Sequence, residues 1–192
     1  LYTFSPPYFR LTYPGNYFTG MNYVADETKD KLSYYSIGWQ IQLGAHTGAH
    51  LFRTDKSGNV IMRRSYRAAG VTQAFTYAYD GQETSDSGYV LMGYDGGGFV
   101  ASRNTLFVIK TITTGALQWA KTYDIPGGTF VDGGGTGLPL VTPSIQQTKD
   151  GGYVFSAVYR VAGVRYAYVF KTDALGVLQW SNRVSGLSLI HI

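Results

Sequence analysis

The sequence predicts an all-β protein built from repeated, four-stranded antiparallel units. Its 192 residues include 25 glycines and 17 tyrosines, and aromatic side chains make up 16% of the chain. Such a composition favours strands joined by many short turns. The chain also repeats itself: RTDKSGNVIM at 53–62, KTITTGALQW at 110–119 and KTDALGVLQW at 171–180 are related segments. Four strands repeated at a spacing of about 60 residues are typical of the blades of a β-propeller.

A second repeated segment precedes the first at a similar distance each time. QETSDSGYVLMG at 82–93 aligns without a gap on QQTKDGGYVFSA at 146–157. A weaker copy, TKDKLSYY at 28–35, aligns when one residue is inserted. The chain therefore contains three copies of one unit, and these copies differ in length mainly in their glycine-rich connections.

The last copy shows most clearly how one unit divides into strands. Runs of Tyr, Val, Phe and Trp are separated by KDGG, by a loop at 160–164 and by DALG. Asp and Gly are common in turns, and aromatic and β-branched residues are common in strands. The predicted strands are 144–148, 152–159, 166–172 and 177–184.

The hairpin between the third and fourth strands depends on a glycine in each copy. Gly58, Gly115 and Gly176 are expected to adopt the positive φ that closes a short turn. In the strand that follows the last of these turns, Leu178 and Trp180 are expected to share one face. This expectation rests on the alternation of side chains along a strand.

These motifs resemble those of a known family, the repeat proteins of secreted or cell-surface type whose units carry DGGY followed by KTDANGNVLW. The resemblance covers 24–185 and implies a β-propeller used for binding or display, with no known catalytic site. Two turns depart from the family pattern. Ile112 stands where Asp is expected, and the first copy lacks the DGGY glycines, so both turns are expected to be built differently.

The repeat also places the expected blade boundaries. Residues 22–70 form the first blade, 71–128 the second, and 129–186 a long connection followed by the third. Residues 1–21 are expected to contribute the end strand of a preceding blade and a linker. The tail LSLIHI at 187–192 breaks the repeat and resembles translated sequencing-adapter read-through. Because a propeller ring needs about four to eight blades, the chain is expected to be an incomplete β-propeller fragment.

Most catalytic and metal-binding chemistries lack the residues they require. The chain has no cysteine, which excludes disulfides and thiolate catalysis. His46 and His50 have the spacing of a helical zinc site, but the neighbouring glycines favour a loop or a strand. The Asp-containing turns lack the alternating acids of a calcium loop, and the glycine clusters lack the helix and lysine of a phosphate cradle. No cofactor and no metal is therefore expected.

Charge and hydropathy limit the partners that the chain can have. The net charge is +4, and the basic residues are scattered except for MRRSYR at 62–67. This cluster is expected to protect a solvated strand edge rather than to bind nucleic acid. The apolar runs are shorter than the roughly 18 residues of a membrane span. The expected partner is a protein or a glycan, with further blades in the full-length chain.

Strand direction predicts where a ligand would bind. In a four-stranded meander the 1–2 and 3–4 turns lie at one end, and the 2–3 loops and the connections between blades lie at the other. The first group is short and similar between copies, whereas most of the variation in length falls in the second group, as in scaffolds that present a binding surface. The candidate ligand-binding residues are therefore Tyr94, Phe99, Arg103, Arg160 and Arg165.

Three functions remain open on this basis. The leading interpretation is a non-catalytic repeat module that presents its loops to a protein or glycan, outside the cell or at its surface. The alternative is part of a propeller-type polysaccharide hydrolase whose catalytic acids converge at the central channel or lie in further sequence. A third is a structural spacer in a large surface protein.

Overall fold

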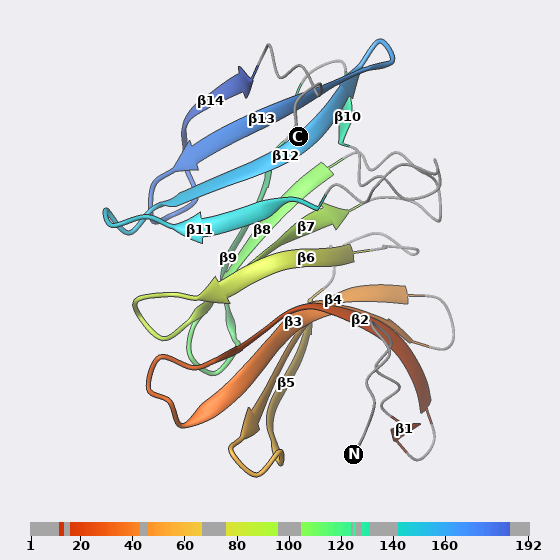
Figure 1. Ribbon diagram of the computed structural model, residues 1–192, viewed down its shortest axis with the longest axis vertical. Coiled ribbons are helices and arrows are strands. Elements are labelled where there is room, and N and C mark those ends of the chain that lie inside the picture. Colours follow the sequence, from red (N-terminus) through yellow and green to blue (C-terminus); the bar gives the residue numbers. More distant parts are fainter. Residues whose placement is uncertain are drawn as a thin grey trace, which may run out of the picture.

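The structure of the chain is a computed structural model, and its described residues form strands and turns (Figure 1). This part of the chain contains no helix of the length and apolarity needed to cross a membrane. Every strand pairing in it is antiparallel, so the predicted all-β class is confirmed there. The described residues are 12–13, 16–42, 46–66, 76–95, 105–123, 125, 128–130 and 142–184.

The first sheet contains five strands that neighbour one another in chain order. Its second strand begins before residue 22, the expected start of the first blade, because its ladder with the third strand extends to the pair Phe18 and Gln42. Residues 16–21 fall in the segment 1–21, which was expected to hold the end strand of a preceding blade and a linker, and they belong to this sheet. The strands are β1 (Thr12–Tyr13), β2 (Asn16–Glu27), β3 (Ser33–Gln42), β4 (His46–Asp55) and β5 (Val60–Tyr66).

The second and third sheets follow in the chain, and they lie within the residue ranges predicted for their blades. The second sheet has four strands, and the third has five, of which β10 and β11 both pair with β12. The second contains β6 (Thr76–Glu83), β7 (Tyr89–Asp95), β8 (Thr105–Thr111) and β9 (Leu117–Tyr123). The third contains β10 (Thr129–Phe130), β11 (Ser144–Gln147), β12 (Tyr153–Val161), β13 (Val164–Thr172) and β14 (Leu178–Val184).

Strands β2 and β6 are interrupted at the same place, and the third sheet is interrupted at the corresponding place. Tyr23 in β2 and Tyr79 in β6 lie where the register with the next strand shifts by one residue. In the third sheet, residues 131–143 separate β10 from β11 at the corresponding place along β12. The bulge that bends a strand in two sheets is therefore the point at which the third sheet carries its long connection.

The β4–β5, β8–β9 and β13–β14 turns, one in each sheet, have the same form. Gly58, Gly115 and Gly176 have φ values of +84°, +72° and +74°, as predicted. In each turn the glycine amide donates a hydrogen bond to the carbonyl three residues earlier. Ile112 therefore closes the same backbone turn as Asp173, and the expectation that the second turn is built differently is wrong.

The first sheet does build its β2–β3 turn differently from the β6–β7 and β11–β12 turns. The closing backbone hydrogen bond joins Thr28 to Ser33, which makes this turn one residue longer than in the other two sheets. Lys31 has a φ of +58°, where Gly151 of the third sheet has +82°. Positive φ is easy for glycine and strained for lysine, so the shape of the turn is repeated even where its composition is not.

A bulge at the start of β5, β9 and β14 changes which side chains share a face. Trp180 lies opposite Lys171, whereas Leu178 lies opposite Thr172, the next residue of β13. Because adjacent strand residues point to opposite faces, Leu178 and Trp180 do not share a face, and that prediction is wrong. The same register shift occurs in the first and second sheets.

Replacing Ile112 with Asp is expected to raise the free energy of unfolding by about 1 kcal/mol. In the third sheet Asp173 Oδ1 accepts hydrogen bonds from the amides of Leu175 and Val177 at 2.9 and 2.8 Å. Ile112 offers no acceptor at this place and is exposed. Urea denaturation measures the effect, with Ile112→Leu as a control that should change little. An unchanged or lower midpoint for Ile112→Asp would contradict the expectation.

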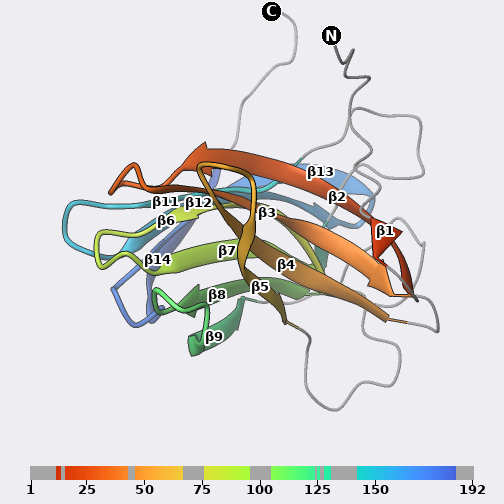
Figure 2. The same ribbon diagram turned by 90° about the horizontal axis from the view of Figure 1, so that it is seen from below.

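The three sheets pack face to face, with the second between the other two (Figures 1 and 2). Strand β7 is buried on both faces, so its side chains alternate between the two cores. Leu91 lies in the core shared with the first sheet, and Met92 lies in the core shared with the third. In Figure 2 the strands β2, β6 and β11 lie along one side of the molecule and β9 along the other.

Candidate binding surface

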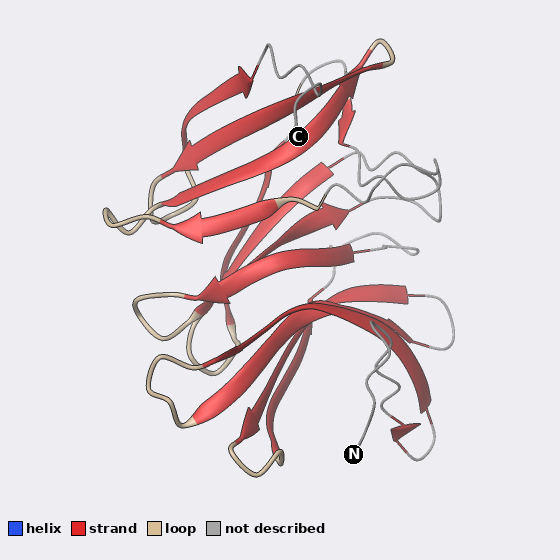
Figure 3. Cartoon of the chain, viewed as in Figure 1, coloured by secondary structure: helices blue, strands red, loops and turns tan. Residues whose placement is uncertain are grey.

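The two ends of the sheets differ in the way that strand direction predicts. One end of the sheets carries the β2–β3, β4–β5, β6–β7, β8–β9, β11–β12 and β13–β14 turns (Figure 3), and we call it the turn end. The turn between β12 and β13 lies at the opposite end, which we call the loop end. The candidate ligand-binding residues were predicted for the loop end.

A basic side chain holds the turn end of each sheet together. The ammonium group of Lys110 is buried and donates to both carboxylate oxygens of Asp86, at 3.0 and 2.8 Å. It also donates to the carbonyl of Thr111 at 2.8 Å. The corresponding ion pairs in the other two sheets are Arg53 with Asp30 and Lys171 with Asp150.

The carboxylate of Asp86 is committed to the turn in which it lies. Burial alone would raise its pKa, but hydrogen bonds from Lys110, from the Thr84 hydroxyl and from the Gly88 amide lower the pKa to about 2. Gly88 is required here because a Cβ would lie 2.0 Å from the carbonyl oxygen of Thr111. The carboxylate oxygens of Asp86 therefore accept their hydrogen bonds from groups of the turn end itself.

At the loop end, the structure brings two predicted residues together. Arg160 of β12 and Arg165 of β13 lie directly opposite each other in the ladder. The chain between these strands is a two-residue turn, Ala162 and Gly163, with φ values of +47° and +83°. Two positive φ values are the mark of a tight hairpin turn. The loop expected at 160–164 is thus a tight turn that sets two arginines side by side.

The environment of this arginine pair suits an anionic group. Directly opposed residues have Cβ atoms about 5 Å apart, and like charges in that position repel each other. Both side chains are half-buried, and the Nε atom of Arg160 is buried with no hydrogen-bond partner among the described residues. Guanidinium groups bind carboxylate, sulfate and phosphate through paired hydrogen bonds. An anion at this place would supply an acceptor for the Nε atom of Arg160.

Of the other predicted ligand-binding residues, only Tyr94 lies in the described part of the chain, and it does not join this pair. Tyr94 belongs to β7 and is 0% exposed, because its ring packs against Tyr79 and Phe130 at centroid distances of 5.7 and 5.8 Å. Its assignment to a ligand-binding loop is wrong, since the strand extends further than expected and alternation turns its ring to the core. Phe99 and Arg103 lie outside the described residues.

The two histidines considered for zinc lie in one strand. His46 and His50 both belong to β4, and residues four apart on a strand are separated by about 13 Å. That separation rules out a shared metal ion. In the described residues no group of three or more His, Cys, Asp or Glu side chains is arranged to hold a metal.

Two grooves at the sheet junctions were not foreseen from the sequence. One lies between β5 and the β8–β9 turn, and the other between β9 and the third sheet, each of about 460 Å³. The second is lined by Lys121, Tyr168 and Phe170, with Tyr123 at its base donating to the carbonyl of Gly176 at 2.8 Å. Burial raises the pKa of Tyr123, so its hydroxyl stays a donor. Both grooves form where two neighbouring sheets meet. Aligning the repeats with one another does not reveal contacts between them.

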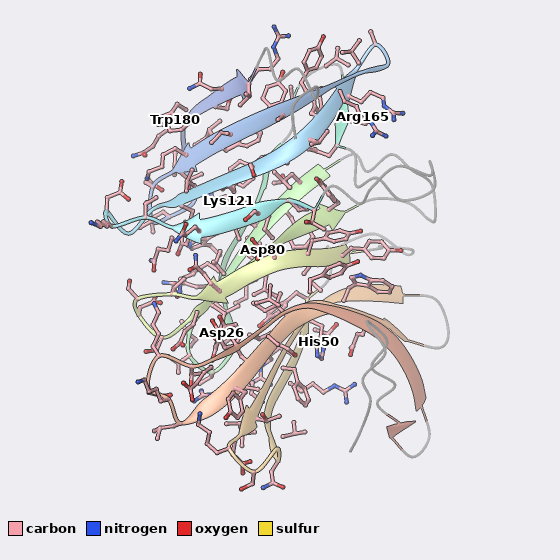
Figure 4. The ribbon with its side chains drawn as sticks, in the orientation of Figure 1. Asp26, His50, Asp80, Lys121, Arg165 and Trp180 are labelled. Carbon is pink, nitrogen blue, oxygen red and sulfur yellow. The ribbon has the colours of Figure 1, made fainter. Side chains whose placement is uncertain are left out.

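Comparison of the chain with protein-family models and with curated proteins finds no match. The candidate site is therefore described from the positions of its residues in this structure. It consists of Arg160 and Arg165, which lie at the loop end of the third sheet, far from Trp180 at the turn end (Figure 4).

Proposed function

We propose that the chain is a non-catalytic β-propeller repeat module, part of a larger secreted or cell-surface protein, that binds a protein or glycan at its loop end. Three features support a propeller: sheets of four or five antiparallel strands, their face-to-face packing, and turns repeated in all three. The observation that carries the binding function is the opposed pair Arg160 and Arg165. The ligand group it fits is an acidic one.

The carboxylates between the sheets support a binding role over a hydrolytic one. A glycosidase needs two free carboxyl groups about 5 to 10 Å apart. Asp80 Oδ2 accepts a hydrogen bond from the amide of Ile145 at 2.7 Å, and Glu83 Oε2 accepts one from the amide of Lys29 at 2.6 Å. Both groups are thus used to join neighbouring sheets.

A glycan array that carries acidic and neutral oligosaccharides tests this function. We expect binding to members with carboxylate or sulfate groups, and we expect Arg160→Gln and Arg165→Gln each to weaken it about tenfold, the loss of one charge-assisted hydrogen bond. Arg64→Gln, an exposed arginine of β5, is the matched control and should have no effect. Equal binding to neutral members, or variants that bind as well as the parent, would contradict the proposal.

A further inference from the structure

The groove between β9 and the third sheet, which we call the aromatic groove, has both of its walls in this chain. One wall is β9, and the other is formed by β13, β14 and the turn that joins them. Phe170 of β13 lies opposite Ser181 of β14, so these two side chains share a face of the third sheet. Phe170 is 2% exposed and packs against Tyr123 of β9 at a centroid distance of 6.4 Å. The groove therefore lies on the face that the third sheet turns toward the second.

The junction between the first and second sheets is closed where the aromatic groove is open. The repeat aligns Gly93 with Ala157, and the strand residues opposite these two are Phe107 and Tyr168. Phe107 is 4% exposed and belongs to the core that the second sheet shares with the first. Tyr168 is only partly buried, and it lines the groove. The opening is therefore specific to the second junction and is not a general consequence of the repeat.

The third sheet lines the groove mainly with apolar side chains. The rings of Tyr168 and Phe170 lie 6.2 Å apart between centroids, with an angle of 30° between their planes. Val177 and Leu178 also line the groove, and they are 53% and 46% exposed. The volume of about 460 Å³ falls within the range of small-molecule sites. A flat apolar body would cover these side chains and pack on the two rings.

The charge around the groove is positive. Lys121 of β9 lines it, and its stem lies against Gly176, where an added Cβ would approach Cγ of the lysine to 3.0 Å. Lys121 is exposed and has no ion-pair partner among the described residues. Arg183, opposite Tyr168 on the same face, lies over the ring of Tyr166 at 4.7 Å. The described residues that line the groove include no Asp or Glu, so the charge favours an anionic ligand.

We propose that the aromatic groove binds a small aromatic carboxylate. The ring of the ligand packs on Tyr168 and Phe170, and its carboxylate accepts a hydrogen bond from the ammonium group of Lys121. Ser181, which lines the same groove, supplies a hydroxyl as a second donor. The groove between β5 and the β8–β9 turn has no aromatic side chain in its lining and does not fit this class. The aromatic groove is separate from the loop-end arginine pair, so this proposal does not depend on the proposed function.

Titration of the isotope-labelled full chain with cinnamate, followed by heteronuclear NMR, tests the proposal. We expect saturable shifts of the amide signals of Leu178 and Ser181 with a Kd of about 1 mM, as suits a ligand of about a dozen non-hydrogen atoms. Cinnamamide has the same shape without the charge and should bind about fivefold more weakly, the contribution of one partly exposed charge pair. The absence of saturable shifts at these two amides would overturn the proposal.

Two substitutions assign the contacts. Lys121→Met keeps an apolar stem against Gly176 but removes the charge, so cinnamate should bind about fivefold more weakly and cinnamamide as before. Lys149→Met, at an exposed lysine of the turn end, is the matched control and should change neither affinity. Ser181→Leu fills the groove and should weaken both ligands at least about tenfold. Near-ultraviolet circular dichroism checks that the variants stay folded.

A third variant separates this site from the loop-end site. Arg160→Gln should leave the affinity for cinnamate unchanged, whatever the glycan array shows, because Arg160 does not line the groove. The proposal is wrong if Arg160→Gln weakens cinnamate as much as Lys121→Met does. It is also wrong if Lys121→Met keeps the full preference for cinnamate over cinnamamide, or if folded Ser181→Leu binds both ligands as the parent does.

Discussion

Replacing Asp86 with Ala is expected to lower the free energy of unfolding by about 3 kcal/mol. The ammonium group of Lys110 is buried and donates to both oxygens of Asp86. Without that carboxylate, the buried cation would keep only the carbonyl of Thr111 as a partner. An uncompensated buried charge is far more costly than a surface ion pair is stabilising. Urea denaturation followed by tyrosine and tryptophan fluorescence measures the loss.

Asp150 provides the matched control for this substitution. It pairs with Lys171 at the same place in the third sheet, but the Lys171 side chain is 13% exposed, against 4% for Lys110. Asp150→Ala should therefore cost no more than about 1 kcal/mol, the value of a hydrated ion pair. Adding Lys110→Met to Asp86→Ala should recover most of the lost stability, because the buried charge is then gone. Equal losses at Asp86 and Asp150 would refute the role given to burial.

Stability is expected to fall by about 3 kcal/mol between pH 7 and pH 4 because of His50. Burial, aided by the nearby charge of Arg63, lowers the pKa of His50 from its ordinary value of 6.5 to about 4. Between these values the unfolded chain binds a proton that the folded chain does not, so the free energy of unfolding falls as the pH falls through this window. The Nδ1 atom of His50 has no hydrogen-bond partner among the described residues, so protonation there would bury an unsatisfied donor.

His50→Phe isolates this contribution. Phe107 holds the same register position in the second sheet, opposite Gly93 as His50 is opposite Gly38, so the substitution uses a ring that the repeat already accepts. The variant should lose most of the pH dependence above pH 4, while the contribution of Asp86 disappears only as the pH falls from about 4 towards 2. If the variant and the parent lose stability equally between pH 7 and pH 4, His50 is not the responsible group.

The local parts of the fold were predictable from the sequence. The positive φ of Gly58, Gly115 and Gly176 was predicted because a short hairpin requires a residue that tolerates it. The turn at Ile112 shows the limit of such reasoning, since the missing Asp suggested a different turn and the backbone forms the same one. Hydrogen bonds between the flanking strands determine that turn, and the side chain only adds to its stability.

The sequence predicted part of the candidate site, but the reason given for it, a variable loop, is not what the structure has there. Arg160 and Arg165 were chosen because a variable loop was expected there, yet they flank a tight turn and lie opposite each other in a ladder. Tyr94 was chosen on the same ground and lies in the core. Loop length alone does not reveal where a strand ends, because strand ends depend on the partner strand.

The sequence by itself determined the repeat, the strand alternation and the turn glycines, because these depend on residues that are close together in the chain. Only the tertiary structure decided which faces are covered and where bulges turn Leu178 away from Trp180. Coverage depends on contacts between sheets, whose residues lie roughly 60 positions apart in the chain, and a bulge depends on the register with the partner strand. Burial against another sheet does not change the local sequence pattern of a turn. The turns at Gly58, Gly115 and Gly176 therefore have similar sequences although their surroundings differ.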